Sequence, residues 1–217
     1  MTDFRQDFLR FAATQRALLF GEFVTKAGRA SPYFFNAGMF ATGAALGHLC
    51  EFYVKAIHAA DIKFDVLFGS AYKGIPLAAG VAICLARAGR DVPFSFNRKE
   101  AKDHGEGGVV VGAPLTGRVL IIDDVISAGT SVRESVRIIR DLGAEPCAVA
   151  IALDRMERGL DNRSAAQEVE QNFGIPVISI VSLADLVTYL RTEGNAEEHL
   201  APVLAYRERY GVADHVR

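Results

Sequence analysis

The stretch of sequence that decides the fold is VLIIDDVISAGTSVRES, which runs from Val119 to Ser135. It opens with four apolar residues, and such a short β-rich run is typical of a buried strand. Two adjacent carboxylates, Asp123 and Asp124, follow at once, and a loop of small and hydroxyl-bearing residues leads into a helical pattern. We therefore predict a strand, loop and helix of an α/β fold, with polar groups at the carboxyl end of the strand.

Other short apolar runs support the same architecture, because each of them also precedes a helical pattern. The predicted strands are Asp65–Gly69, Arg118–Asp123, Cys147–Asp154 and Pro176–Val181. Strands that alternate with helices are typical of a mostly parallel central sheet with helices on its faces. The predicted fold class is therefore α/β.

Two segments have the apolar spacing of a helix with one buried face. Between Thr42 and Ala60 the apolar residues fall three or four positions apart, at Leu46, Leu49, Tyr53, Ile57 and Ala60. The second stripe consists of Val132, Val136, Ile139 and Leu142, with Gly143 as the expected C-terminal stop and Arg133, Arg137 and Arg140 on the outer face. We interpret both stripes as core.

The first 40 residues have a different pattern. A predicted helix at Asp3–Gln15 is followed by short extended pieces at Leu18–Val24 and Tyr33–Asn36, separated by turn residues. We expect residues 1–40 to form a small N-terminal cap, or hood, on the main sheet.

The segment Arg98–Pro114 combines many charges with glycines and has no apolar period, so we predict a long mobile loop there. The chain has no internal repeat and no low-complexity linker. Its 217 residues correspond to about 1.4 average domains. We therefore expect one domain over residues 1–217, with the hood as a subregion.

Composition excludes several classes of protein. Half of the residues are hydrophobic and 23% are charged, which excludes a disordered or fibrous chain. The 24 basic and 26 acidic residues give a formal net charge of -2, which argues against nucleic acid as a partner. The longest nearly apolar run, Gly74–Ala86, is too short to cross a bilayer, so no membrane partner is expected.

The cysteines and histidines indicate no structural metal or disulfide. Cys50, Cys84 and Cys147 are odd in number, far apart in sequence and form no CxxC pair. The five histidines lack the spacing of paired metal ligands. A reducing, cytoplasmic location fits this usage best.

The loop after Asp124 has the composition of a phosphate site. Its small residues allow backbone N–H groups to approach an anion, and the N-terminus of the following helix adds about half a positive charge. Carboxylates at the carboxyl end of a parallel strand are well placed to accept hydrogen bonds from sugar hydroxyls. A plainer interpretation makes Asp123 and Asp124 a turn, with Thr130 or Ser131 as an N-cap. We favour a ligand, because two adjacent carboxylates repel one another and cost folding free energy.

The segment VLIIDDVISAGTS is similar to the signature with which type I phosphoribosyltransferases bind phosphoribosyl diphosphate (PRPP). Four more segments resemble the orotate phosphoribosyltransferase family: KAGRASPYFFNAG at Lys26–Gly38, GSAYKGIPLA at Gly69–Ala78, FNRKEAKDHGEGG at Phe96–Gly108 and LDRMERG at Leu153–Gly159. This resemblance implies the type I phosphoribosyltransferase fold. It also implies Mg²⁺-dependent transfer of the phosphoribosyl group from PRPP to orotate, which gives orotidine 5'-monophosphate and pyrophosphate in pyrimidine synthesis.

The resemblance also implies a set of PRPP-binding residues. They are Lys26, Tyr72, Lys73, Arg98, Lys99, Lys102, His104, Asp123, Asp124, Val125, Ile126, Ser127, Ala128, Gly129, Thr130 and Ser131. Among them, Lys73, Lys102, Asp123 and Asp124 are the expected catalytic residues. In relatives a non-proline cis peptide precedes the residue that Tyr72 matches.

The family pattern places orotate against Phe34, Phe35, Ser127 and Arg155. Aromatic rings suit a flat pyrimidine, and a guanidinium can hold its carboxylate with two hydrogen bonds. Relatives often carry threonine where Ser127 stands and proline where Ser70 stands.

The resemblance further implies a homodimer. In the family, the loop that matches Arg98–Gly108 closes over the active site of the neighbouring subunit and brings Lys102 and His104 to the pyrophosphate. The magnesium ion is expected to arrive on PRPP, without a direct protein ligand.

Two rival functions remain from the sequence. A purine or uracil phosphoribosyltransferase would share the phosphate site, but would not need Arg155 or the segment Phe34–Asn36. A PRPP-sensing regulator would keep the fold and bind nucleic acid, which the slightly acidic balance and the missing helix-turn-helix segment disfavour.

Overall fold

The computed structural model describes residues 3–25, 27–102, 108–126, 129–159, 162–193 and 197–212. Its strands are β1 (Leu18–Val24), β2 (Ala30–Phe35), β3 (Val66–Gly69), β4 (Phe94–Lys102), β5 (Gly108–Gly112), β6 (Arg118–Ile122), β7 (Glu145–Asp154) and β8 (Val177–Ser182). Its helices are α1 (Phe4–Thr14), α2 (Gly43–Ala59), α3 (Gly74–Arg87), α4 (Thr130–Asp141), α5 (Ala165–Phe173), α6 (Leu183–Thr192) and α7 (Leu200–Tyr210). Short 3₁₀ helices are η1 (Ala37–Met39) and η2 (Glu197–His199).

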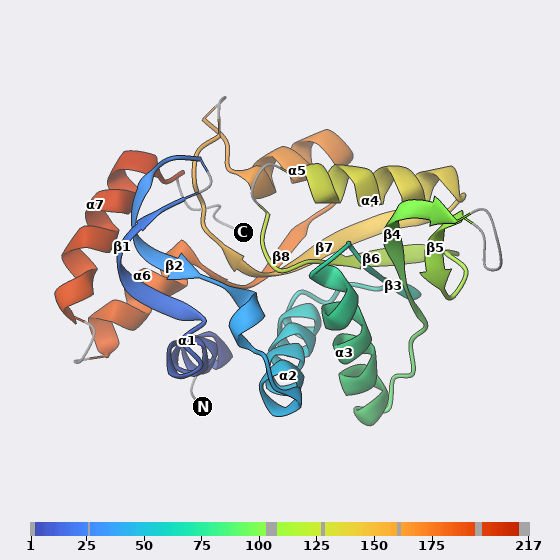
Figure 1. Cartoon of the computed structure of the whole chain (residues 1–217), viewed down its shortest axis with the longest axis horizontal. Coiled ribbons are helices and arrows are strands. Elements are labelled where there is room, and N and C mark those ends of the chain that lie inside the picture. Colours follow the sequence, from blue (N-terminus) through green and yellow to red (C-terminus); the bar gives the residue numbers. More distant parts are fainter. Residues whose placement is uncertain are drawn as a thin grey trace.

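The central sheet has the strand order β5-β4-β3-β6-β7-β8. Neighbouring strands are parallel except β4 and β5, which are antiparallel. Helices α2 and α3 cover one face of this sheet, and α4 and α5 cover the other (Figure 1). The structure thus confirms the predicted α/β class and the four predicted strands, with small shifts at their ends.

The covered faces explain why the central strands are apolar throughout. Along β6, Leu120 and Ile122 pack on the α2–α3 side, whereas Val119 and Ile121 pack on the α4–α5 side. All four side chains are fully buried. Burial of each such side chain contributes roughly 1.5–3 kcal/mol, so this strand is held strongly in the middle of the sheet.

The predicted helical stripes are largely confirmed. Helix α2 begins after the N-cap Thr42, whose side chain accepts a hydrogen bond from the Ala45 N–H. In α4, Val132, Val136 and Ile139 are buried, but Leu142 is 54% exposed. Leu142 is the C-cap residue, and Gly143 follows with φ +79°, so the chain turns away before the last position of the stripe can reach the core.

The prediction of a long mobile loop at Arg98–Pro114 is wrong for much of that segment. Strand β4 continues to Lys102, and β5 returns beside it, with Phe96 opposite Val111 and Asn97 opposite Val110. The valines of β5 favour this pairing, and the charges are tolerated because β5 is the edge strand and β4 pairs with β3 only over Phe94–Phe96. The hairpin was not predicted because the charges and glycines of this segment interrupt the apolar alternation of its strands.

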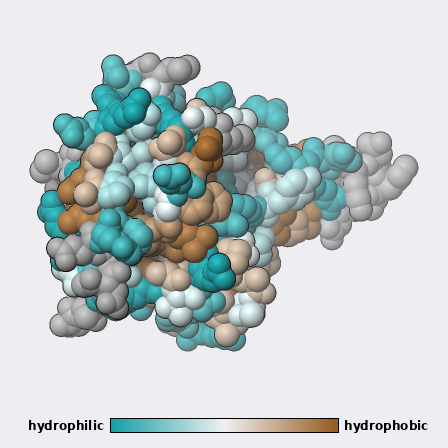
Figure 2. Space-filling view, turned by 60° about the vertical axis from the view of Figure 1, so that its left-hand side comes forward, coloured by the Kyte–Doolittle hydropathy of each residue, from teal (hydrophilic) through white to brown (hydrophobic). Residues whose placement is uncertain are grey.

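The hood has its own two-stranded antiparallel sheet, in which Leu18 pairs with Phe35 and Leu19 with Phe34. Together with α1, α6 and α7 it forms one end of the molecule (Figure 1). Figure 2 shows this end with apolar patches between polar side chains. Among the described residues, no helix combines the length and hydropathy needed to span a bilayer.

The nearly apolar run Gly74–Ala86, which is too short to cross a bilayer, forms most of α3. Gly80 of α3 faces the fully buried Cys50 of α2, and a Cβ at Gly80 would lie 2.4 Å from the Cys50 Sγ. Helices α2 and α3 therefore meet at a point where only glycine fits beside this cysteine.

We expect Gly80→Ala to lower the free energy of unfolding by about 1–3 kcal/mol, because the added methyl group overpacks this contact. Cys50→Ala should relieve the clash, so the double variant should lose less than the sum of the single losses. Urea denaturation followed by circular dichroism measures both.

Gly47→Ala in α2 is the matched control, because a Cβ there meets nothing within 4 Å. It should be neutral or stabilising, since alanine favours the helix by up to about 1 kcal/mol. Strictly additive losses in the Gly80→Ala and Cys50→Ala pair would contradict the packing argument.

Candidate functional site

The site lies where β3 and β6 end side by side. Helix α3 follows β3 on one face of the sheet, and α4 follows β6 on the opposite face (Figure 1). The two connections diverge at this point, and the carboxyl ends of strands at such a point are the usual ligand position in open α/β sheets. The loops after both strands carry residues that the sequence analysis selected.

Asp123 and Asp124 are held firmly at the end of β6. The Asp123 N–H donates to the Ala150 carbonyl, and the Asp124 carbonyl accepts from the Ala152 N–H, so the backbone stays registered with β7. The buried Tyr53 of α2 donates its hydroxyl to the Asp123 carbonyl at 2.7 Å. Both aspartates are only 6% exposed. The position of these carboxylates is therefore fixed by the sheet.

The Asp123 carboxylate is satisfied by its own loop. Its Oδ1 accepts from the Asp124 N–H at 2.9 Å, and its Oδ2 accepts from the Ser131 hydroxyl at 2.9 Å. Burial nevertheless raises the pKa of Asp123, and the Asp124 charge adds to that rise, while Ser70 and these hydrogen bonds oppose it. The Ser70 hydroxyl faces the carboxylate outside good hydrogen-bond geometry, and it is buried without another partner among the described residues.

Asp124 pairs with Lys73 from the neighbouring loop. Lys73 Nζ lies 2.6 Å from Asp124 Oδ2, and the lysine side chain is 56% exposed. The structure thus brings together one residue from each of the two predicted motifs. The lysine end of this pair is open to solvent, whereas the Asp124 side chain is only 9% exposed, so Lys73 can turn toward an anionic ligand while Asp124 stays in place.

The loop that carries Lys73 packs directly on the end of β6. A Cβ at Gly69 would lie 2.5 Å from the Gly74 carbonyl oxygen, and a Cβ at Gly74 would lie 2.4 Å from that of Ile122. The Ala71 N–H donates to the side chain of the buried Asn97 on β4 at 2.8 Å. The peptide between Ala71 and Tyr72 is cis, as the family resemblance predicts, and Tyr72 is 70% exposed.

The start of α4 fits an anion. Its N-cap is Gly129, with φ +66° and no side-chain hydrogen bond to the first turn. The plainer interpretation, in which Thr130 or Ser131 caps this helix, is wrong: Thr130 is the first helical residue, and the Ser131 hydroxyl serves Asp123 instead. Val125 and Ile126 are half-buried before this turn.

Several predicted residues lie outside the described part of the chain. Lys26, His104, Ser127 and Ala128 belong to this group, as does the side chain of Lys102. Of the other basic residues, Lys99 lies 3.4 Å from Glu134 of α4, and Arg98 is half-buried on β4.

The predicted orotate residues lie on the hood and after β7. Phe34 and Phe35 point to opposite faces of the hood sheet, as neighbours on a strand must. Phe34 is 40% exposed and stacks on Phe23 at 5.5 Å, whereas Phe35 packs against the core beside Phe8. Arg155 follows β7 directly and contacts the hood through Ser31.

Sequence reasoning missed three positions in this region. The sequence predicts Tyr53 only as part of the helical core stripe, and Asn97 lies within a quoted motif without a role of its own. Glu157, which contacts Arg155, also received no role. The strand of Asn97 reads FSFNRKEAK, so no sequence signal singles out this asparagine among its polar neighbours, and neither Tyr53 nor Glu157 has such a signal.

Comparisons with known proteins agree with this geometry. The family described as "Phosphoribosyl transferase domain" matches residues 37–180. The chain is 65% identical over 98% of its length to the orotate phosphoribosyltransferase of Laribacter hongkongensis, and 62% identical over 99% to that of Chromobacterium violaceum. In both cases the whole of the relative is covered.

A solved structure of orotate phosphoribosyltransferase from Francisella tularensis superposes with a TM-score of 0.86 and 41% identity. The match covers 94% of this chain and 99% of the other. The phosphate-type loop, the paired aspartates and these matches lead to one assignment: the chain belongs to the orotate phosphoribosyltransferase family, within the type I phosphoribosyltransferases.

Proposed function

We propose that the chain transfers the phosphoribosyl group of PRPP to N1 of orotate, giving orotidine 5'-monophosphate and pyrophosphate, as an orotate phosphoribosyltransferase of pyrimidine biosynthesis. The observation that carries this proposal is the buried Asp123–Asp124 pair between an uncapped helix N-terminus and Lys73. These groups suit the phosphate, the sugar hydroxyls and the diphosphate of one ligand.

The 5-phosphate is assigned to the loop from Val125 to Ser131. Backbone N–H groups at the start of α4 and the partial positive charge of that helix attract a phosphate. Gly129 supports this role, because a left-handed residue without a side chain lets the ligand approach the backbone. The adjacent carboxylates of Asp123 and Asp124 then accept hydrogen bonds from the ribose hydroxyls.

The diphosphate is assigned to Lys73, with the exposed Tyr72 beside it. As pyrophosphate leaves, C1 of the ribose acquires oxocarbenium character, and the orotate nitrogen attacks from the opposite face. Lys73 and Lys102 stabilise the charge that grows on the leaving group, a contribution that is largest in the transition state. Arg98, Lys99, His104 and Lys26 complete the proposed PRPP contacts. No covalent nucleophile is needed.

Magnesium is proposed to enter as the PRPP complex. Among the described residues, no group of three or more histidine, cysteine, aspartate or glutamate side chains could hold a metal ion. The Asp123 oxygens already accept hydrogen bonds, and one oxygen of Asp124 binds Lys73. The donor set therefore suits an ion held mainly by substrate oxygens, where it neutralises the diphosphate.

We further propose that the chain acts as one domain in a homodimer, and that the β4–β5 hairpin serves the active site of the partner. The hairpin lies at the outer edge of the sheet (Figure 1), and the last pair of its described part joins Lys102 to Gly108. Such a position is suited to reaching a neighbouring subunit. The free thiols of Cys50, Cys84 and Cys147 support a cytoplasmic location.

Purified protein with Mg²⁺ and PRPP should consume orotate, measured as loss of orotate absorbance, and should leave uracil and hypoxanthine unused. Preference for uracil or hypoxanthine would favour a rival phosphoribosyltransferase. Absence of turnover together with PRPP-dependent retention of DNA or RNA on a filter would favour the regulator.

Lys102→Ala should lower kcat by about 10²–10³, because a cation that stabilises the leaving charge contributes about 3–4 kcal/mol in the transition state. The melting temperature should stay near that of the wild type. Turnover at the wild-type rate would exclude the catalytic role of Lys102.

Mixing two inactive variants tests whether each active site uses residues of both subunits. When Lys102→Ala and Asp124→Asn proteins are combined and allowed to exchange subunits, half of the dimers are hybrids, and each hybrid has one site without either substitution. Activity should return to roughly a quarter of the wild-type value, if each site draws Lys102 from its partner. If each site instead uses Lys102 of its own subunit, every site in the mixture carries one substitution, and the mixture stays as inactive as its components.

Asp123→Asn should raise stability at neutral pH and abolish turnover. The pKa of Asp123 is raised in the folded protein, so its charged form costs stability above that pKa, and the cost disappears as the pH falls through it toward the unfolded value. Removing the charge should raise the melting temperature by about 2–4 °C, the shift that about 1 kcal/mol produces at this chain length.

The difference in melting temperature between Asp123→Asn and the wild type should shrink on acidification, because the wild-type carboxyl group then becomes neutral too. Scanning calorimetry of both proteins across the acidic range measures this. A difference that grows toward low pH would show that the native state prefers the charged form.

A further inference from the structure

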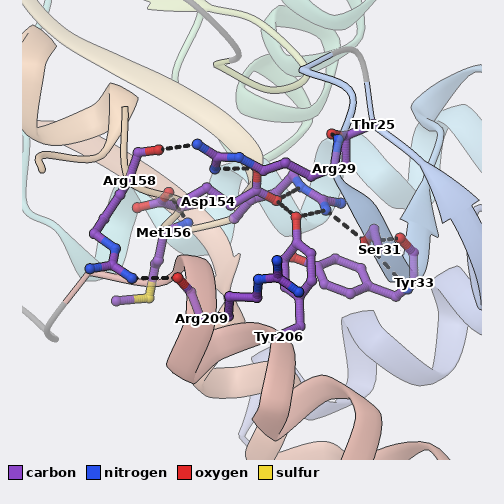
Figure 3. A network of polar contacts seen from close by, with 11 residues as sticks. Thr25, Arg29, Ser31, Tyr33, Asp154, Met156, Arg158, Tyr206 and Arg209 are labelled. Carbon is purple, nitrogen blue, oxygen red and sulfur yellow. Dashed lines mark hydrogen bonds and ion pairs between the residues drawn. The ribbon is translucent and has the colours of Figure 1, made fainter. Parts of the chain in front are cut away.

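The guanidinium of Arg155 lies in a polar network that joins three elements. Arg155 Nε lies 2.6 Å from Glu157 Oε1, and its Nη2 donates to Ser31 of β2 at 3.0 Å and to the Tyr206 hydroxyl of α7 at 3.4 Å. The ring of Tyr33 lies under the guanidinium, with Cζ 4.2 Å from the ring centroid. Figure 3 shows Ser31, Tyr33 and Tyr206 converging on this region from the hood and from α7.

Glu157 is the acceptor at the centre of this network. Its Oε1 accepts from Arg155 and also from the Tyr206 hydroxyl at 2.7 Å, and its Oε2 lies 3.5 Å from Arg29 Nη1. The Glu157 side chain is only 17% exposed. Arg29 is anchored independently, because its Nη2 donates to the Arg158 carbonyl at 2.6 Å. Glu157 therefore fixes one edge of the Arg155 guanidinium from a buried position.

The remaining donors of Arg155 define where an anion can bind. The Nε and Nη2 groups are used, whereas Nη1 has no hydrogen-bond partner among the described residues, so the expected grip through two nitrogens of Arg155 is reduced to one nitrogen. The Arg155 side chain is 20% exposed. Nη1 is not among the buried unpaired atoms of the described residues, so it remains accessible, and an accessible amino group on a fixed guanidinium suits a carboxylate.

The partners of Arg155 lie where the core borders a hollow. Ser31 and Tyr206 are only 3% and 4% exposed, but both also line a hollow of about 810 Å³ between the hood sheet and α7. Where side chains border a hollow, hydrogen bonds decide their orientation. Loss of the Glu157 carboxylate would therefore leave Arg155 free to choose another rotamer.

We propose that Glu157 is a positioning residue for substrate selection: with Tyr206 and Ser31 it fixes Arg155 so that Nη1 alone is presented to the carboxylate of the base. This deepens the proposed function and rests on it, since it takes orotate as the base held by Arg155. Glu157 acts through Arg155 and touches no reacting atom. Its contribution is to the preference for a carboxylated pyrimidine over a bare one.

The test measures steady-state kinetics for the wild type and for Glu157→Ala, Glu157→Gln, Tyr206→Phe and Arg155→Ala. Each protein is assayed with orotate varied at saturating PRPP, with PRPP varied at saturating orotate, and with uracil as the alternative base. Glu51→Gln, an exposed carboxylate on α2 that pairs with His48, is the matched control. Melting temperatures identify variants that fail to fold, and Glu157→Gln keeps the shape and one acceptor oxygen.

Glu157→Ala should raise the KM for orotate about 10- to 100-fold, as loss of a hydrogen bond to a charged group does. The KM for PRPP should change less than threefold, and the preference for orotate over uracil should fall by a similar factor to the rise in orotate KM. Glu157→Gln should have a smaller effect, and Tyr206→Phe a smaller one still.

An orotate KM within twofold of wild type in Glu157→Ala, or equal rises in the two KM values, would overturn the positioning role. Arg155→Ala separates this failure from that of the proposed function. If Arg155→Ala impairs orotate use and Glu157→Ala does not, only the positioning role is wrong. If the wild type does not use orotate, or Arg155→Ala is silent, the assignment of Arg155 and the inference fail together.

Discussion

The structure depends on the burial of two adjacent carboxylates at the end of its central strand. Asp123 and Asp124 could not remain there without a fixed set of partners, because an unpaired buried charge is expensive. The partners come from elements distant in sequence: Lys73 from the loop after β3, Ser131 from α4 and, on the backbone, Tyr53 from α2. The residual cost appears as the raised pKa of Asp123. The buried carboxylates lower the stability of the free protein and are complementary to a sugar phosphate. Catalysis requires such groups to be stabilised more by the reacting ligand than by the empty site.

The loop around Lys73 shows how steric limits place this chemistry. Gly69 and Gly74 leave no room for a Cβ, so the loop lies against the end of β6, and Lys73 reaches Asp124. On the other side of the site, Arg155 follows β7 and is held by groups of the hood and α7. The sheet thus fixes the half of the site that suits PRPP, whereas a polar network fixes the half that suits the base.

Much of the fold was predictable because it depends on local patterns. The strand before Asp123, the stripe of α2 and the hood strand Leu18–Val24 all carry clear apolar periods, and the structure has them. The β4–β5 hairpin was missed because charges at a sheet edge are solvated and leave the period weak. A helix was expected after Asp65–Gly69, but the bounds of α3 were not, because a helix that packs on both α2 and the sheet is apolar on most sides and lacks an amphipathic stripe.

The site was predictable to the extent that its residues belong to contiguous motifs. The pairing of Lys73 with Asp124 joins positions 51 residues apart, and that of Ser31 with Arg155 joins positions 124 apart, so neither follows from local spacing.

The most direct test of the account is a crystal structure with PRPP and Mg²⁺ bound. The account predicts the ribose hydroxyls on Asp123 and Asp124 and the 5-phosphate at the start of α4. Well-ordered PRPP bound elsewhere, with the Lys73–Asp124 pair unchanged, would contradict it.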